Sequence, residues 1–197
     1  FYGLMTFFWV TYKDFASLIR YEKRGLLKAQ NASFNIELSK LILHKVLYYS
    51  IILGLPIILL DIAWWHILLG WFSMHFVCGV ILACIFQSAH VVPSSEYPLP
   101  DQENKVEGDF AVHQMKTTAN FAPGNRLLSW YVGGLNYQIE HHLFPNMCHI
   151  HHREVSKIVK KTAQEFSLPY ISQPTFFGAL FKHLRLLHTL GQGNQEK

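Results

Sequence analysis

The chain lacks positive charge over a long stretch in its middle. No lysine or arginine occurs over residues 46–104, while seven of the seventeen basic residues precede this stretch and ten follow it. A domain in water carries basic side chains over most of its surface, so a gap of this length favours a segment surrounded by lipid. The net charge of +4 is too small to indicate a nucleic-acid partner, and no basic helix with interleaved aromatic residues is present.

Cysteine pairs and an N-terminal leader are also lacking. The three cysteines form no C-x-x-C pair and give no indication of a disulfide scaffold or a cysteine-based zinc site. The chain begins at Phe1 inside an apolar aromatic segment, without an initiator Met or a basic n-region. We therefore interpret its start as the cut end of a longer protein and not as a signal peptide.

Half of the residues are hydrophobic, and their distribution predicts two membrane spans. Residues 41–60 and 62–86 form apolar runs of about 20 residues or more, enough to cross a hydrocarbon core of about 30 Å. Because the connection around Asp61 carries no basic residue, the positive-inside rule assigns both basic flanks to the cytoplasm, at a bacterial inner membrane or the endoplasmic reticulum. The alternative is a buried helical hairpin of a soluble protein, but two such spans are hard to bury in 197 residues.

The part of the chain after the spans is predicted to be polar and helical. Periodic patterns predict helices over residues 110–121, 152–166 and 176–190, and Gly133-Gly134 marks the entry to a further short helix. We therefore predict an all-α fold, consisting of an integral membrane helical hairpin plus a cytoplasmic helical cap. The cap, residues 90–190, contains the histidines that could form a metal site.

Two adjacent histidines are the first candidates for chemistry. Gln138, His141 and His142 stand at i, i+3 and i+4, so a helix presents all three on one face. Imidazole is a ligand for iron, zinc and copper, but surface histidines of a polar helix give the same pattern. Residues 149–152 (His-Ile-His-His) could form a zinc site, although no carboxylate or cysteine lies at a matching spacing.

The other histidines are interpreted by where they lie relative to the apolar runs and the basic flanks. His90 closes the second apolar run, and an ionisable residue at that depth indicates a function, with a half-wet interfacial histidine as the alternative. His66 and His75 lie farther from the basic flanks, and we expect them to pack or to form helix–helix hydrogen bonds. His113 could orient a metal ligand, and His183 on the last helix is expected to be solvated.

The string Gln-Ile-Glu-His-His-Leu-Phe-Pro at 138–145 resembles the third histidine box of the membrane fatty acid desaturase superfamily. Gln at the first position is typical of its front-end (Delta-5/Delta-6-like) acyl desaturases. The segments FQSAHVV (86–92) and HQMKTTANFAPGN (113–125) add to a resemblance that covers about residues 41–170. It implies that residues 1–197 form a single desaturase domain, the C-terminal portion of such an enzyme.

The resemblance also implies a di-iron centre with two iron ions. The metal ligands that it implies are His90, Gln138, His141 and His142, and the residues expected to support them are His113 and Asn136. The family's other two histidine boxes are absent and would precede Phe1, so the fragment alone is expected to be inactive. His152 stands where relatives often carry Tyr.

The function implied is O2-dependent desaturation of a fatty acyl chain, as acyl-CoA or acyl-lipid, on the carboxyl side of an existing double bond. An unactivated alkyl chain resists side-chain acids and bases, so an iron–oxygen oxidant is required. Expected partners are membrane lipid and cytochrome b5 or ferredoxin as electron donor; the chain has no His-Pro-Gly-Gly haem motif of its own. The alternatives are a sphingolipid desaturase, a lipid hydroxylase on the same scaffold, and a non-catalytic membrane remnant.

Overall fold

The computed structural model describes residues 1–103, 106 and 108–193 and divides the chain into two compact units, Phe1–Ala83 and Cys84–Lys197. Within the described residues the chain is mostly helical, as predicted. The elements of the first unit, in chain order, are η1 (Tyr2–Leu4), α1 (Met5–Phe8), η2 (Trp9–Lys13), α2 (Asp14–Lys23), α3 (Leu26–Ala29), α4 (Phe34–Tyr49), η3 (Ser50–Gly54), α5 (Leu55–Leu59) and most of α6 (Trp64–His90).

Two helices are long and apolar enough to cross a membrane. The first, Phe34–Leu59, joins α4, η3 and α5 into 26 residues, and the second is α6, with 27 residues. No residue is buried in the most apolar window of the first helix, and 17% are buried in that of the second. A core helix of a soluble protein would bury most of these side chains, so their exposure agrees with a lipid environment.

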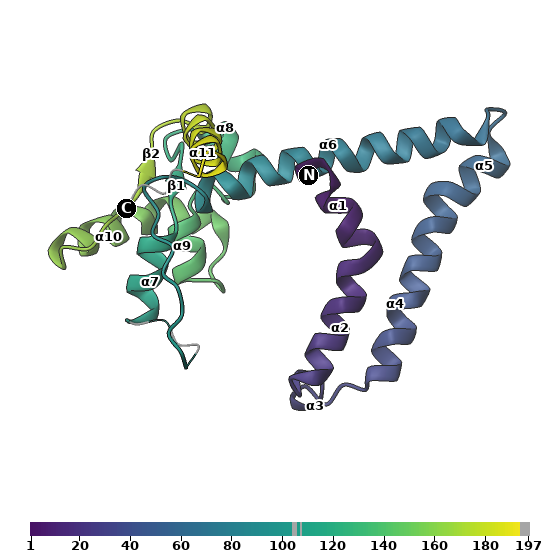
Figure 1. Cartoon of the computed structure of the whole chain (residues 1–197), viewed down its shortest axis with the longest axis horizontal. Helices are drawn as coiled ribbons and strands as arrows, with labels where there is room; N and C mark the ends of the chain where they lie inside the picture. The colour runs from purple at the N-terminus through teal and green to yellow at the C-terminus, as the bar shows by residue number, and fades with distance from the viewer. Residues whose placement is uncertain (104–105, 107, 194–197) are drawn as a thin grey trace. The chain divides into compact units, whose positions relative to one another are not determined.

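The first of these helices contains its own irregularity. The π-helical turn η3 (Ser50–Gly54) ends two residues before Pro56, which has no backbone N–H to donate. A π-turn beside a proline is a common way for an apolar helix to accommodate the missing hydrogen bond. Figure 1 shows that α2 and α4 run antiparallel and pack together, and Lys45 Nζ on α4 lies 2.5 Å from Asp14 Oδ2 on α2.

The start of the chain packs closely on α6. A Cβ atom at Gly79 would lie 2.7 Å from the Gly3 carbonyl oxygen, so glycine at both positions lets the backbones approach. Polar contacts accompany this packing, since Thr6 Oγ1 donates to the His75 carbonyl at 2.6 Å and Tyr48 OH lies 2.6 Å from His75 Nε2. The expectation of a helix–helix hydrogen bond at His75 is confirmed.

The second unit begins with the end of α6 and contains, in chain order, α7 (Phe110–Thr117), β1 (Asn120–Phe121), α8 (Arg126–Tyr131), α9 (Gln138–Leu143), η4 (His149–His151), α10 (His152–Glu165), β2 (Ser172–Gln173) and α11 (Phe176–Gly191). The strands pair in parallel, with Asn120 opposite Ser172 and Phe121 opposite Gln173. The helix predicted over 110–121 therefore ends early, because Thr118 adopts an extended backbone and the next residues pair with a distant strand.

Two hydrophobic clusters hold the second unit together. One joins the end of α6 to β1 and α11 through Ile85, Phe121 and Ala179. The other packs α7, α9 and α10 around Ile139, and Figure 1 shows α9 beside α7. His183 on α11 is also buried, and its Nδ1–H donates to the Val91 carbonyl at 2.8 Å. The expectation of a solvated His183 is wrong, because its ring satisfies a backbone carbonyl at the end of a helix 92 residues earlier.

Gly79→Ala should lower the free energy of unfolding by about 1–3 kcal/mol, because its Cβ would meet the Gly3 backbone and not a flexible side chain. Gly70→Ala is the matched control, since it makes the same change on the same helix where no atom lies within 4 Å. The comparison requires denaturant unfolding of both variants in lipid nanodiscs. Equal stabilities would show that this close approach does not hold the first unit together.

Candidate functional site

The short helix α9 carries the adjacent histidines and is entered through a glycine turn. Gly133 and Gly134 have φ values of 59° and 75°, a backbone region that favours glycine. The Tyr137 N–H then donates to the Gly134 carbonyl at 3.0 Å, directly before Gln138 begins the helix. Gln138 and Glu140 are both buried, so this six-residue helix places polar side chains inside the protein.

A closed set of hydrogen bonds holds α9 in position. Glu140 accepts from Asn120 Nδ2 at 2.8 Å and from Tyr170 OH at 2.9 Å, and Asn120 Nδ2 also donates to Tyr170 OH. Asn120 Oδ1 accepts from the Ile139 N–H at 2.9 Å. We call Asn120, Glu140 and Tyr170 the anchor triad. It joins β1, α9 and the segment before β2, so the histidines are fixed by residues distant in the sequence.

Asn120 and Glu140 of the anchor triad are fully buried, and Tyr170 is half-buried. Burial raises the pKa of Glu140, an effect that the hydrogen bonds from Asn120 and Tyr170 partly offset. Burial and the negative charge of Glu140 raise the pKa of Tyr170. Tyr170 therefore remains a hydroxyl donor at any ordinary pH, which is the form that the Glu140 carboxylate needs.

The imidazoles lie in a connected series. The rings of His90 and His142 are 5.0 Å apart between centroids, those of His141 and His142 are 5.8 Å apart, and those of His141 and His152 are 6.1 Å apart. These four rings, which we call the histidine cluster, come from the end of α6, from α9 and from the start of α10. In the part of the chain that the structure describes, no three His, Cys, Asp or Glu side chains are arranged to hold a metal ion by themselves.

His142 is oriented by a residue that the sequence did not single out. Its Nδ1 lies 2.7 Å from Gln114 Oε1 on α7, and because an amide oxygen only accepts, Nδ1 carries the proton and Nε2 keeps its lone pair. Burial, followed by the charges of His90 and His141, lowers the pKa of His142 to about 4. The ring is therefore neutral at physiological pH, as a metal ligand must be.

The two residues predicted to support the ligands make hydrogen bonds to residues outside the histidine cluster. His113 is the neighbour of Gln114 on α7, and Gln114 makes the contact with His142. Asn136 is buried before α9, and its Nδ2 donates to Ser129 Oγ at 2.9 Å and to the Ala122 carbonyl at 3.3 Å. Asn136 thus ties the turn that leads into α9 to the segment around α8.

Three buried side chains around α9 have polar atoms without a hydrogen-bond partner among the described residues. They are Asn136, at Oδ1, Gln138, at Nε2, and His152, at both ring nitrogens. Burial lowers the pKa of His152, and the Gly134 backbone beside the ring partly offsets this effect. Buried polar atoms without a partner require an explanation, and a bound ion or water is one such explanation.

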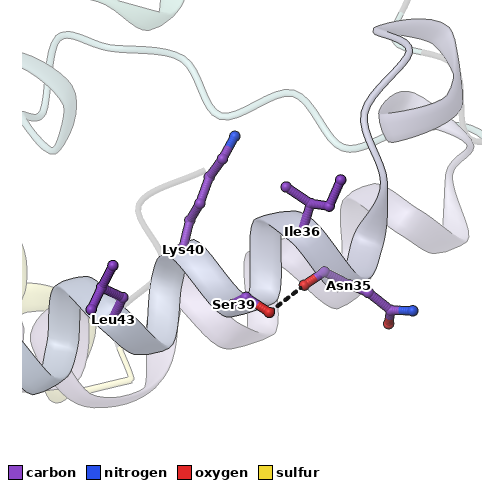
Figure 2. A pocket seen from close by; sticks show the side chains of 5 residues that line it. All are labelled: Asn35, Ile36, Ser39, Lys40 and Leu43. Atoms are coloured by element: carbon purple, nitrogen blue, oxygen red, sulfur yellow. Dashed lines mark hydrogen bonds between the residues drawn. The ribbon is translucent and has the colours of Figure 1, made fainter.

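A surface depression elsewhere has different chemistry. Figure 2 shows it at the start of α4, where Ser39 Oγ donates to the Asn35 carbonyl at 2.8 Å. Its volume is about 370 Å³, and its lining residues are Asn35, Ile36, Ser39, Lys40 and Leu43. It belongs to the first unit, and no histidine lines it. We therefore take the histidine cluster of the second unit, and not this depression, as the candidate site.

Glu140→Gln should lower the free energy of unfolding by about 1–3 kcal/mol, because the new amide group would face donors from Asn120 and Tyr170 in a buried site. Glu154→Gln is the matched control on the exposed surface of α10 and should leave stability unchanged. Thermal unfolding in nanodiscs compares the two. If Glu140→Gln behaves like the surface variant, the anchor triad does not hold α9.

Comparison with known proteins points to one protein family. The fatty acid desaturase family model matches residues 1–174. The chain is 38% identical to sn-1 linoleoyl-lipid 6-desaturase of Synechocystis sp., over 81% of this chain and 44% of that protein. It is 44% identical to acyl-lipid (8-3)-desaturase of Physcomitrium patens, over 58% of this chain and 24% of that protein. A probable Delta(5) fatty acid desaturase C of Dictyostelium discoideum is 28% identical, over 85% of this chain and 37% of that protein.

The chain therefore spans less than half the length of these curated relatives. No solved structure matches it significantly. The 6- and Delta(5)-desaturase names agree with the front-end resemblance of the QIEHHLFP string. The family model covers most of the chain, and the prediction of the family is confirmed: the chain belongs to the fatty acid desaturase family.

Proposed function

We propose that this chain is the C-terminal part of an O2-dependent front-end desaturase whose di-iron centre includes residues of the histidine cluster. The contact between His90 and His142 carries the proposal, because it joins the end of an apolar helix to the histidine motif at 5.0 Å. Metal–nitrogen bonds of about 2.1 Å put two imidazoles on one metal at roughly 4.5–6.5 Å between centroids. The separations of 5.0 Å and 5.8 Å fall in this range.

The residues present fit a metal as part of a larger ligand set. His90, His141 and His142 would supply imidazole nitrogens and Gln138 an amide oxygen, with the other ligands in segments of the full-length enzyme outside this sequence. Two bound irons, supplied with O2 and two electrons from cytochrome b5 or ferredoxin, would provide the oxidising power that an unactivated alkyl chain requires. This division of ligands is also why we expect the chain alone to be inactive.

The chain's own side chains prepare the site in three ways. Burial keeps the His142 ring neutral, so its Nε2 lone pair is available without the loss of a proton. Gln114 accepts a hydrogen bond from Nδ1–H of His142, so the nitrogen with the lone pair is Nε2. The anchor triad fixes the direction in which α9 presents His141 and His142, because Glu140 lies directly before them and is fully buried.

The substrate we propose is a fatty acyl chain on a membrane lipid, desaturated on the carboxyl side of an existing double bond. Relatives named as linoleoyl-lipid and acyl-lipid desaturases support an acyl-lipid over an acyl-CoA. The two exposed apolar helices support a site beside a bilayer, where such a chain is available. The charge distribution supports a cytoplasmic location of the histidine cluster.

In the full-length enzyme, His141→Ala and His142→Ala should each abolish turnover, because each removes an imidazole from the metal. Gln138→Ala should lower turnover by about 10–100-fold, as for residues that act through a ligand or a bound water. The measurement is new unsaturated fatty acid per unit of expressed enzyme, by gas chromatography of cells supplied with linoleate, with iron content determined in parallel.

The control is His188→Ala, which removes an exposed imidazole from α11 and should leave product and iron unchanged. Substantial product from His141→Ala and His142→Ala would contradict the proposed metal site. Near-normal product from Gln138→Ala alone would show that Gln138 has a structural role. Gln138 would then no longer be counted among the proposed ligands.

The proposed orientation predicts the labelling of single cysteines introduced at Asp61 and Ser156 after the three native cysteines are replaced. In intact cells, an impermeant maleimide should label the cysteine at 61 and spare the one at 156, because the basic flanks face the cytoplasm. Both positions should react after the membrane is permeabilised. Labelling of position 156 and not 61 in intact cells would reverse the orientation.

A further inference from the structure

His152 is a buried histidine whose surroundings do not account for its polar atoms. The side chain is 2% exposed, and neither ring nitrogen has a hydrogen-bond partner among the described residues. His183 in the same unit is equally buried, yet its Nδ1–H donates to the Val91 carbonyl. A histidine kept only for packing would follow His183, because an unpaired buried nitrogen costs free energy that an apolar ring would not.

The position of His152 suggests what its nitrogen is for. Its ring lies 6.1 Å from that of His141, within the range of two imidazoles on one metal that His90, His141 and His142 also satisfy. His149 and His151, in the turn directly before it, are exposed. The chain therefore turns one histidine of this group of three toward His141 and leaves the other two in solvent.

The Gly134 backbone packs closely against His149 and His152. A Cβ atom on Gly134 would lie 2.8 Å from His149 Cβ and 3.4 Å from His152 Nδ1, so only glycine lets this turn pack so closely. Farther along α10, Val159 and Ala163 are buried in the cluster that also contains Ile139 of α9. Helices α9 and α10 are thus joined through a shared core, which holds His152 in register with His141.

We infer that His152 contributes its Nε2 to the same metal centre as His141, as an additional imidazole beyond the motif on α9. In this arrangement Nδ1 faces the Gly134 backbone and Nε2 remains for the metal. The inference rests on the proposed function, because it assigns His152 to the centre that His141 and His142 are proposed to form.

The test uses the full-length enzyme loaded with ferrous iron, with the rate of iron release to an excess of chelator as the readout. His152→Phe should release iron at least about 10-fold faster than the unchanged enzyme, the size of loss expected when a metal site loses a supporting group. His151→Phe makes the same change one residue earlier at an exposed position and should release iron at the unchanged rate.

A second measurement separates ligation from folding. The unfolding temperature of iron-free His152→Phe should equal or exceed that of the unchanged protein, because the substitution removes unpaired buried polar atoms while keeping a ring of similar shape. Weaker iron retention together with an undiminished apo stability supports the inference. A lowered apo stability, or iron release as slow as in the unchanged enzyme, overturns it.

His141→Ala serves to distinguish the two proposals. If His141→Ala releases iron rapidly and His152→Phe does not, the metal site stands and His152 is no part of it. If neither variant changes iron release, the proposed function itself fails. If His151→Phe accelerates release as much as His152→Phe does, the iron is bound at the exposed turn of residues 149–152, and the inference is wrong.

Discussion

The hydrogen bonding of the Glu140 carboxylate is the constraint on which the rest of the second unit depends. A buried carboxylate is costly unless each oxygen has a donor, and here Asn120 and Tyr170 supply one donor apiece. Asn120 can do so only while β1 holds it beside α9, and Tyr170 only while the chain before β2 lies against both. One carboxylate thus requires three segments to meet, and the orientation of the neighbouring histidines follows from that meeting.

Electrostatics and packing act in the same direction at the histidine cluster. Burial, together with the charges of His90 and His141, disfavours protonation of the His142 ring and lowers its pKa. The packing of α7 against α9 also brings Gln114 to this ring. The surroundings of His142 therefore set both its protonation state and its orientation.

Local features of this structure could be predicted from the sequence, whereas contacts between distant segments could not. The spacing of Gln138, His141 and His142 defines one helical face, and the periodic patterns located α10 and α11 to within a residue or so at each end. The role of Gln114 depends on how α7 packs against α9, a matter that periodicity does not encode. The early end of α7 has the same origin, since it is set by the pairing of Asn120 with Ser172.

His90 and His152 show what the sequence could and could not reveal about the candidate site. A functional role of His90 could be inferred because an ionisable residue at the end of an apolar run is rare. The sequence grouped His152 with His149 and His151 as a possible zinc site, but it gave no signal that separates His152 from these two. Only its burial beside His141 separates it from its exposed neighbours.

The position of Tyr170 in the chain has a consequence for biosynthesis. The ribosome makes α9 thirty residues before the tyrosine that completes the anchor triad, so a nascent chain that has exposed every histidine of the cluster still lacks the means to hold them in place. The order of synthesis therefore delays assembly of the site until the C-terminal segment has been translated. A polypeptide released shortly after the QIEHHLFP string would carry the motif without the contacts that fix its orientation, so the presence of the motif does not by itself ensure the arrangement of the histidine cluster.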